Sequence, residues 1–447
     1  MKTPICDFVE NYNKNHHIRF HMPGHKGKGS LGTECLDITE INGADVLYHA
    51  DGIIKESETN ATTLFQTGKT FYATEGSTLC IKAMLALVMK YGKHLEKNIK
   101  IAAGRNAHKA FITGCALLDL TPVWIQGENS TSLLSCDISA KYLDSFLSQE
   151  KDTIIAVYLT TPDYLGNILD IKALSEVCHR HGALLLVDNA HGAYLHFLPE
   201  SIHPAFLGAD LVCDSAHKTL PVLTGGAYLH ISKNAPTFFM NHSKEALMIF
   251  ASTSPSYLIL QSLDACNAYL ANGYREKLYS FSAKLIDVKK ELRKMGYSLI
   301  GKESLKITLA TKPVGYEGNE VAHILQKMGI YCEASDKDYV VLMITPENTE
   351  KELASLLEAF RCIPKKEPIL VFPPKSIPAS PLLSPKEAIM ACSESLPIEN
   401  CIGRIVAEPS VNCPPAVPIV ICGEIVLPEH IPMLRYYGIK KLRVVAI

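Results

Sequence analysis

Three patterns are missing from this sequence of 447 residues: a block of five consecutive Lys or Arg, a run of eighteen uncharged apolar residues, and a Cys-x-x-Cys pair. Without a basic block, and with a net charge of −2, the chain lacks the long-range attraction that nucleic acid or anionic lipid requires. Without a long apolar run, no membrane-spanning helix is predicted. Because the 14 cysteines are scattered, we expect reduced thiols, mostly small core residues, and we predict no disulfide framework and no metal site.

The beginning of the chain lacks the apolar segment of a secretory signal and carries Asp7 and Glu10 instead. We therefore expect a cytoplasmic protein. Apolar residues make up 47% and charged residues 20%, which is ordinary globular usage and argues against a disordered or fibrous chain. A chain of this length is expected to form two or three lobes with a large core, as in an enzyme.

Short apolar runs alternate with helix-like segments between about residues 60 and 232. The runs lie at residues 100–103, 121–125, 153–159, 183–187, 209–212 and 226–230. This alternation predicts an α/β fold in which a mainly parallel sheet carries helices on both faces. Functional residues in such sheets lie just beyond the carboxyl ends of the strands.

After residue 256 the pattern changes to a long helical segment and then to shorter strands and helices that end near residue 360. A stretch rich in Pro, Lys and Ser follows, which is typical of an extended linker. The predicted domains are an N-terminal arm (1–55), a large domain (56–290), a small α/β domain (291–362), a linker (363–385) and a C-terminal domain (386–447).

Lys218 is the first candidate for chemistry. It stands in the segment 214–219, DSAHKT, which follows a predicted strand and precedes the pair Gly225-Gly226. A lysine amine condenses with an aldehyde cofactor, and its pKa falls readily in a partly desolvated site. The alternative is an ordinary surface lysine.

Asp188 ends the apolar run LLLVD, one strand–helix–strand unit before Lys218. A carboxylate in that position can keep the pyridine nitrogen of pyridoxal phosphate (PLP) protonated, which the electron-sink chemistry of this cofactor requires. The alternative is a helix N-cap.

Two further motifs are candidates, and the second of them directly follows a predicted strand. Gly76-Ser77-Thr78 precedes an apolar helix, whose free N–H groups and dipole favour an anion such as a phosphate. In the segment 104–109, GRNAHK, the imidazole of His108 can stack on a flat heteroaromatic ring. A simple N-cap and a solvated helix cap are the respective alternatives.

Taken in order, these motifs resemble the ornithine/lysine/arginine decarboxylases of the aminotransferase-like, fold type I PLP enzymes, in their short form without an N-terminal wing domain. The matching stretches are residues 20–27, 76–78, 105–109, 161–166, 187–192, 215–220 and 252–257.

The resemblance implies a role for each motif. Lys218 would be the Schiff-base lysine, Asp188 the pyridinium partner and His108 the stacking residue, with Lys218 or His217 returning a proton to the α-carbon. The phosphate would be surrounded by Gly76, Ser77, Thr78, Ser215 and His217, and His191 would lie near the phenolic oxygen of the cofactor. Residues 21–26 and 252–257 would line the substrate entrance. A homodimer with a shared site is implied, to which the loop at Ser252 and Thr253 can come from the second subunit.

The fold that the resemblance implies is a mainly parallel, seven-stranded-type sheet with a small α/β domain and a C-terminal α+β domain. The reaction it implies is decarboxylation of a basic amino acid for polyamine synthesis, with arginine preferred and lysine or ornithine as alternatives. The distal cation of such a substrate needs an acid, for which Asp45, Asp51, Glu424 and Glu75 are candidates.

The sequence departs from the family pattern at several positions. Glu75 stands where a neutral residue is expected, Asn189 replaces the usual acid after Asp188, and Asp214 stands where an amide is common. Near the C-terminus, residues 412–418 and Cys422 replace parts of two Pro- and Gly-rich stretches. Two other functions therefore stay open: another fold type I reaction, such as that of an aminotransferase or lyase, and a catalytically silent PLP-binding homologue. An aminotransferase would need a carboxylate-binding arginine, for which Arg361 and Arg404 are the candidates.

Overall fold

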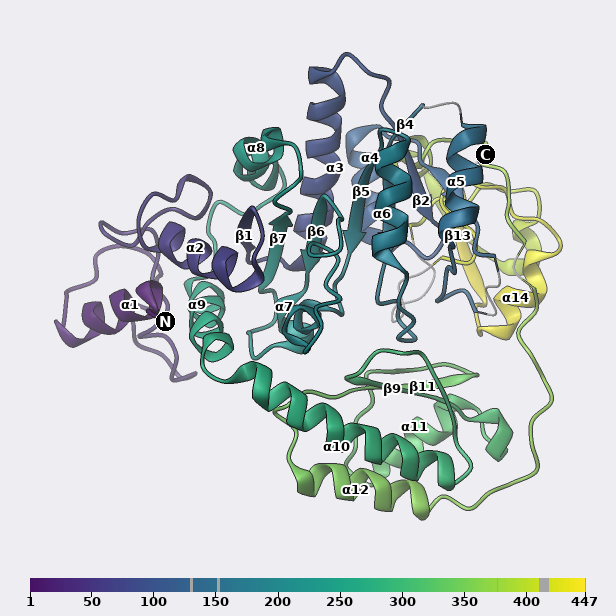
Figure 1. Cartoon of the computed structure of the whole chain (residues 1–447). Coiled ribbons are helices and arrows are strands. Elements are labelled where there is room, and N and C mark those ends of the chain that lie inside the picture. Colours follow the sequence, from purple (N-terminus) through teal and green to yellow (C-terminus); the bar gives the residue numbers. More distant parts are fainter. Residues whose placement is uncertain (129–131, 151–152, 376, 410–417, 447) are drawn as a thin grey trace. The chain divides into compact units, whose positions relative to one another are not determined.

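The computed structural model describes residues 1–128, 132–150, 153–375, 377–409 and 418–446 (Figure 1). The chain divides into two compact units, each built from two segments of sequence. The first unit comprises Met1–Ile99 and Ile171–Leu278, and the second comprises Lys100–Asp170 and Tyr279–Ile447. The five domain boundaries proposed from the sequence stay a prediction.

The first unit contains four strands and the helices around them. Its elements are α1 (Pro4–Lys14), η1 (Leu47–His49), α2 (Ile53–Phe65), β1 (Lys69–Ala73), α3 (Gly76–His94), α6 (Ile171–Arg180), β5 (Leu184–Asp188), η2 (Ala193–Phe197), β6 (Leu211–Asp214), α7 (Ala216–Thr219), β7 (Ala227–Ile231), α8 (Thr237–Met248) and α9 (Tyr257–Ala271). Helix α10 (Tyr274–Lys294) begins in this unit and continues into the second.

The strands of the first unit follow the order β1-β7-β6-β5. Strands β5 and β6 are parallel, whereas β7 runs antiparallel to both β6 and β1. All residues of β5, β6 and β7 are buried, as expected for strands covered on both faces. These strands lie side by side in Figure 1, and α3 packs against all three of them. Because β5 and β6 are parallel, their carboxyl ends meet at one edge of the sheet.

The N-terminal arm has a helix that the sequence analysis did not predict. Asp264 on α9 accepts hydrogen bonds from the backbone N–H groups of Ile5 and Cys6, at 2.9 and 3.0 Å, in the first turn of α1. Its other oxygen accepts from Ser57 Oγ on α2 at 2.5 Å. A carboxylate at a helix N-terminus satisfies N–H groups that have no partner within the helix. One buried acid therefore attaches α1 to α2 and α9.

The second unit contains three parallel strands in the order β4-β2-β3 and two antiparallel sheets, β10-β11-β9-β8 and β12-β13. Its elements are β2 (Lys100–Gly104), α4 (Lys109–Leu118), β3 (Val123–Ile125), α5 (Ala140–Gln149), β4 (Ile154–Thr160), β8 (Ser298–Ile300), β9 (Lys306–Ala310), η3 (Lys312–Val314), α11 (Gly318–Lys327), β10 (Ala334–Ser335), β11 (Tyr339–Met343), α12 (Glu350–Arg361), α13 (Pro385–Met390), β12 (Ser393–Pro397), η4 (Ile398–Cys401), α14 (His430–Tyr436) and β13 (Lys441–Val445). The seven strands β1 to β7 include six that were expected from apolar runs, and the predicted mainly parallel α/β architecture is confirmed.

Lys312 joins three parts of the second unit. Its Nζ donates to Asp338 Oδ1 at 2.7 Å and to the backbone carbonyl of Val371 at 2.6 Å. Tyr436 on α14 donates to the same carboxylate oxygen at 2.6 Å. A buried charge that is paired and fully hydrogen-bonded avoids the large cost of desolvation. One buried lysine thus links η3 to residue 338, to residue 371 and to α14 within the second unit.

Most of the described cysteines are buried, as the sequence analysis predicted. The thirteen cysteines in the described part of the chain form no disulfide, and eight of them are buried. No helix among the described residues is long and apolar enough to cross a membrane.

Candidate active site

Lys218 lies on the short helix α7, which begins directly after strand β6. Its Nζ is 3.2 Å from Nε2 of His191, a residue that is 6% exposed. The structure therefore brings together an amine and an imidazole that the sequence separates by 27 residues. At this distance the pair shares a hydrogen bond, and His191 can exchange a proton with the lysine amine.

The start of α3 has the features of an anion site. Gly76 has a φ of +73°, a conformation that glycine adopts without strain, and its N–H donates to the carbonyl of Gly225 at 2.7 Å. Ser215 Oγ donates to Ser77 Oγ at 2.7 Å. The first turn of a helix leaves N–H groups without an intrahelical acceptor. Two hydroxyls and these N–H groups could therefore bind a phosphate.

His217 lies beside the same helix start. A Cβ atom at Gly76 would be 4.0 Å from His217 Cε1, so this imidazole borders the glycine. Its Nδ1 is 3.0 Å from the carbonyl oxygen of Gly226. Because a carbonyl can only accept, Nδ1 carries the proton, and Nε2 is an acceptor when the ring is neutral.

Asp188 ends β5 and is 3% exposed. Its Oδ1 accepts from the N–H of Ala190 at 3.2 Å and lies 3.6 Å from Cys213 Sγ on β6. Asp188 and Cys213 are register partners in the parallel pair β5–β6. No α-helix begins at Asp188, because the next element is the 3-10 segment η2. Its carboxylate thus lies at the sheet edge from which the Lys218 segment emerges.

Asp214, the last residue of β6, is a buried anion with three side-chain donors. Its oxygens lie 2.6 Å from Asn189 Nδ2, 3.0 Å from His203 Nε2 and 3.1 Å from His230 Nε2. Burial alone would raise the pKa of Asp214, but the two imidazoles outweigh it and hold the pKa below its usual range. The Asn189–Asp214 bond joins the ends of β5 and β6. Two departures from the family pattern are therefore partners of one another.

His203, Asp214 and His230 each have one possible ligand atom for a metal. These three atoms lie within 4.8 Å of one another, which is close enough to hold a metal ion. His203 Nδ1, however, accepts the N–H of Ala205 at 3.3 Å, so its Nε2 carries the proton that it donates to Asp214. A protonated nitrogen has no lone pair for a metal. We interpret the cluster as a hydrogen-bond network in which a proton lies between His203 and Asp214.

His196 lies beside His203, with the ring centroids 6.2 Å apart, and is 1% exposed. Its Nε2 has no hydrogen-bond partner, and burial, followed by the charge of His203, lowers the pKa of His196 to about 3. The unfolded chain would take up a proton here near pH 6.5, whereas the folded chain would not. As the pH is lowered below about 6.5, the free energy of unfolding should therefore decrease. His196 alone should contribute about 1.4 kcal/mol to this decrease for each pH unit.

A His196→Phe variant tests this expectation. Phenylalanine fills the space among the rings of Phe65, Phe197 and Phe206 and binds no proton. Urea unfolding at about pH 7 and pH 5, at fixed protein concentration, should show a smaller loss of stability for the variant than for the unmodified chain. Equal losses would contradict the assignment.

His108 lies in the second unit, as the N-cap of α4, and its Nδ1 accepts from the N–H of Ala110 at 3.1 Å. The neighbouring Arg105 is not solvated: both its terminal nitrogens bind Glu424, at 2.7 Å each, and its guanidinium lies 5.6 Å from the centroid of the Trp124 ring. Stacking of His108 on a cofactor stays a prediction.

The C-terminal departures have structural explanations where the structure describes them. Burial, and then the charge of Glu424, raises the pKa of the Cys422 thiol to about 12, so Cys422 is a protonated core residue. Gly423 has a φ of +91°, and a Cβ there would be 2.2 Å from the carbonyl oxygen of Leu383. Most of the resembling stretch 412–418, namely residues 412–417, lies outside the described residues.

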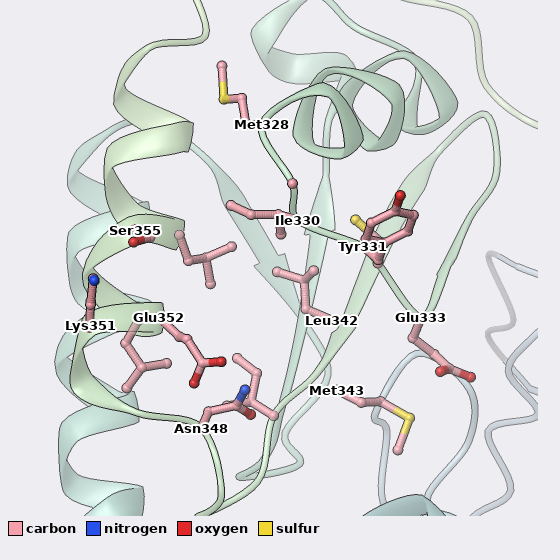
Figure 2. A pocket seen from close by; sticks show the side chains of 15 residues that line it. Met328, Ile330, Tyr331, Glu333, Leu342, Met343, Asn348, Lys351, Glu352 and Ser355 are labelled. Atoms are coloured by element: carbon pink, nitrogen blue, oxygen red, sulfur yellow. The ribbon is translucent and has the colours of Figure 1, made fainter. Parts of the chain in front are cut away.

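A groove of about 770 Å³ lies in the small domain of the second unit (Figure 2). It is lined by the segment 328–333 that follows α11 and by parts of β11 and α12, with Tyr331 and Leu342 among its apolar residues. None of its lining residues is one of the predicted cofactor or catalytic residues.

The sequence analysis did not identify His203 and His230 as partners of Asp214. The two histidines follow no recognisable motif and meet Asp214 only through the fold.

Comparison with known proteins places these residues in a family. The family model described as Orn/Lys/Arg decarboxylase, major domain, matches residues 3–310, and the model for the C-terminal domain of the same family matches residues 375–442. The chain is 29% identical to an arginine decarboxylase of Halalkalibacterium halodurans over 97% of the chain and 93% of that protein. It is 27% identical to an arginine decarboxylase of Bacillus subtilis over 96% and 92%. A lysine decarboxylase of Francisella novicida has the same fold, with a TM-score of 0.79, 16% identity and coverage of 99% of this chain and 81% of that one.

Proposed function

The chain belongs to the Orn/Lys/Arg decarboxylase family, and from this premise we propose that it removes the α-carboxylate of a basic amino acid as CO₂, using PLP bound at Lys218. A single observation carries the proposal. Asp188 ends β5, and the segment with Lys218 follows β6, which is the parallel neighbour of β5. In this proposal Asp188 would meet the ring nitrogen and Lys218 the aldehyde carbon of one cofactor.

The residues around Lys218 fit PLP. The start of α3 and the hydroxyls of Ser77 and Ser215, 2.7 Å apart, form a cradle for its phosphate. His191, hydrogen-bonded to Lys218, would lie near the phenolic oxygen. When bound, the cofactor withdraws electrons from the α-carbon of the substrate.

The side chains then have distinct tasks. Asp188 would hold a proton on the ring nitrogen, and Lys218 would bind the aldehyde carbon and afterwards return a proton to the α-carbon. His217 is the weaker candidate for that proton, because its Nδ1–H is directed to the carbonyl of Gly226 and its Nε2 lacks a proton in the neutral ring. We assign proton return to Lys218 Nζ, with His191 as its proton partner.

Arginine is the first substrate in the proposal, because the two curated relatives compared above are arginine decarboxylases. Lysine and ornithine are the alternatives. An aminotransferase is less well supported, because both candidate arginines are engaged elsewhere. Arg361 pairs with Glu358 at 3.2 Å, and Arg404 pairs with Glu394 at 2.6 Å.

The proposal includes a homodimer in the cytoplasm. The arm carries strongly exposed apolar side chains, among them Ile18 (82%), Phe20 (93%) and Leu31 (83%), and exposed apolar groups of this kind favour burial against a partner. Ser252 and Thr253 are also exposed, so their loop is available to a second subunit.

The experiment is CO₂ and amine release by the purified, PLP-loaded protein with arginine, lysine and ornithine supplied separately. Release of CO₂ and of the corresponding amine from one of them supports both reaction and substrate. A protein that binds PLP, shown by visible absorbance, and yet releases nothing from any of the three would favour another PLP reaction or a silent homologue.

A further inference from the structure

Four acids were candidates for the distal cation of the substrate, and the structure commits two of them to other partners. Oδ2 of Asp45 accepts the N–H groups of Gly52 and Ile54 at the start of α2, at 3.0 Å each, and its Oδ1 accepts the N–H of Asp51 at 3.1 Å. Glu424 is neutralised by both terminal nitrogens of Arg105. Asp51 is exposed. Glu75 is the remaining acid.

Glu75 stands between β1 and α3, and only one of its two carboxylate oxygens has a hydrogen-bond donor. Its Oε1 accepts the N–H of Ser252 at 3.2 Å, whereas its Oε2 is buried and has no hydrogen-bond partner. Among the residues that the structure describes, no Lys, Arg or His forms an ion pair with it. A buried carboxylate oxygen without a donor is unfavourable, so this atom requires an explanation.

Two buried hydroxyl groups belong to the surroundings of Glu75. The hydroxyl of Tyr48, a residue that is 9% exposed, makes no hydrogen bond, and the charge of Glu75 contributes, after burial, to raising the pKa of Tyr48. Thr74 Oγ1, on the residue next to Glu75, is also buried without a partner. Because a hydroxyl accepts as well as donates, these two oxygens and Oε2 of Glu75 can together accept hydrogen bonds from a ligand that carries several N–H donors.

The position of Glu75 connects it to the proposed site. It precedes Gly76, which borders His217, and it binds Ser252, the first residue of the loop predicted to line the substrate entrance. As the N-cap of α3, its charge is favoured by the helix dipole. A carboxylate at this point lies between the phosphate cradle and the entrance loop.

We propose that Glu75 binds the distal cation, a guanidinium or a primary ammonium, of the basic amino-acid substrate, with the hydroxyl of Tyr48 as a second acceptor. This inference rests on the proposed function. It assigns the acid at position 75 a specificity role, and it explains why a negative charge is placed beside an anion site. A cation supplied by a second copy of the chain is the rival occupant.

The experiment compares arginine with citrulline, which has nearly the same shape and no charge. In Glu75→Gln, kcat/KM for arginine should fall by about 100-fold, the order expected when one partner of a buried charge pair is removed, whereas kcat/KM for citrulline should change little. Tyr48→Phe should lose about 5-fold for arginine, as for one hydrogen bond. Glu56→Gln, which removes an exposed acid on α2, is the matched control and should behave like the unmodified chain.

Binding of agmatine, the amine product of arginine, is measured by calorimetry on the same PLP-loaded proteins, because it reports on the cation site even if no CO₂ is released. Selective weakening of agmatine binding in Glu75→Gln supports the proposal, whether or not turnover is found. Equal losses for arginine and citrulline, an unchanged agmatine affinity, a loss of dimer without a change in specificity, or a selective loss in Asp51→Asn would each overturn it.

Discussion

Lys218→Ala is expected to abolish CO₂ release, with a loss of at least about 10⁴-fold in kcat. This is the upper range for removal of a positioned proton donor or acceptor. The loss is expected to be this large because the same amine also binds the cofactor aldehyde. The variant should fold normally, since Lys218 is only half-buried on the short helix α7. Removal of its Nζ also removes the hydrogen bond to His191 Nε2.

The measurements are CO₂ release and the visible absorbance of added PLP, which should shift to that of the free cofactor. Lys233→Ala is the matched control, because Lys233 is an exposed lysine beyond β7 and should leave both readouts unchanged. Full turnover by Lys218→Ala would contradict the proposed function and would return Lys218 to the status of an ordinary surface lysine.

The sheet was predictable from the sequence because its central strands are buried on both faces. A strand such as β5, LLLVD, is then a continuous apolar run that stands out between helices. Strand β1 was missed because it begins with an exposed lysine and contains two polar or amphipathic residues, KTFYA. The antiparallel direction of β7 was also not predictable, since direction depends on the connection and not on the composition of a strand.

The local parts of the site were predictable for a similar reason. Asp188 and Lys218 follow apolar strands directly, and Gly76 opens an apolar helix, so each signal lies within a few residues of the chain. Asp214 and its two histidines could not be predicted. His203 and His230 reach its Oδ2 from segments 11 and 16 residues away, and such a meeting depends on the register of three strands and loops.

The pair Asn189 and Asp214 illustrates how departures from a family pattern combine. Taken separately, each substitution changes the charge beside a proposed cofactor residue. In the structure the amide donates to the carboxylate at 2.6 Å, and the imidazoles of His203 and His230 stabilise the same anion. Because acid and amide face one another, the segment that follows Asp188 and the segment that precedes Lys218 stay joined. The substitutions therefore retain a polar link between the two strand ends.

Asp188→Asn is expected to retain PLP and to lose at least about 10³-fold in kcat, comparable to the loss of a preorganised electrostatic partner. An amide can still accept the N–H of Ala190, so the turn after β5 should persist, but it carries no charge to hold a proton on the ring nitrogen. Asp210→Asn is a matched control, because Asp210 is another buried acid at the opposite ends of the same strands, where it accepts the N–H of Leu185 at 2.8 Å. That variant should lose stability without a change in the absorbance of bound PLP. Turnover and absorbance near normal in Asp188→Asn would mean that this carboxylate only orders the turn.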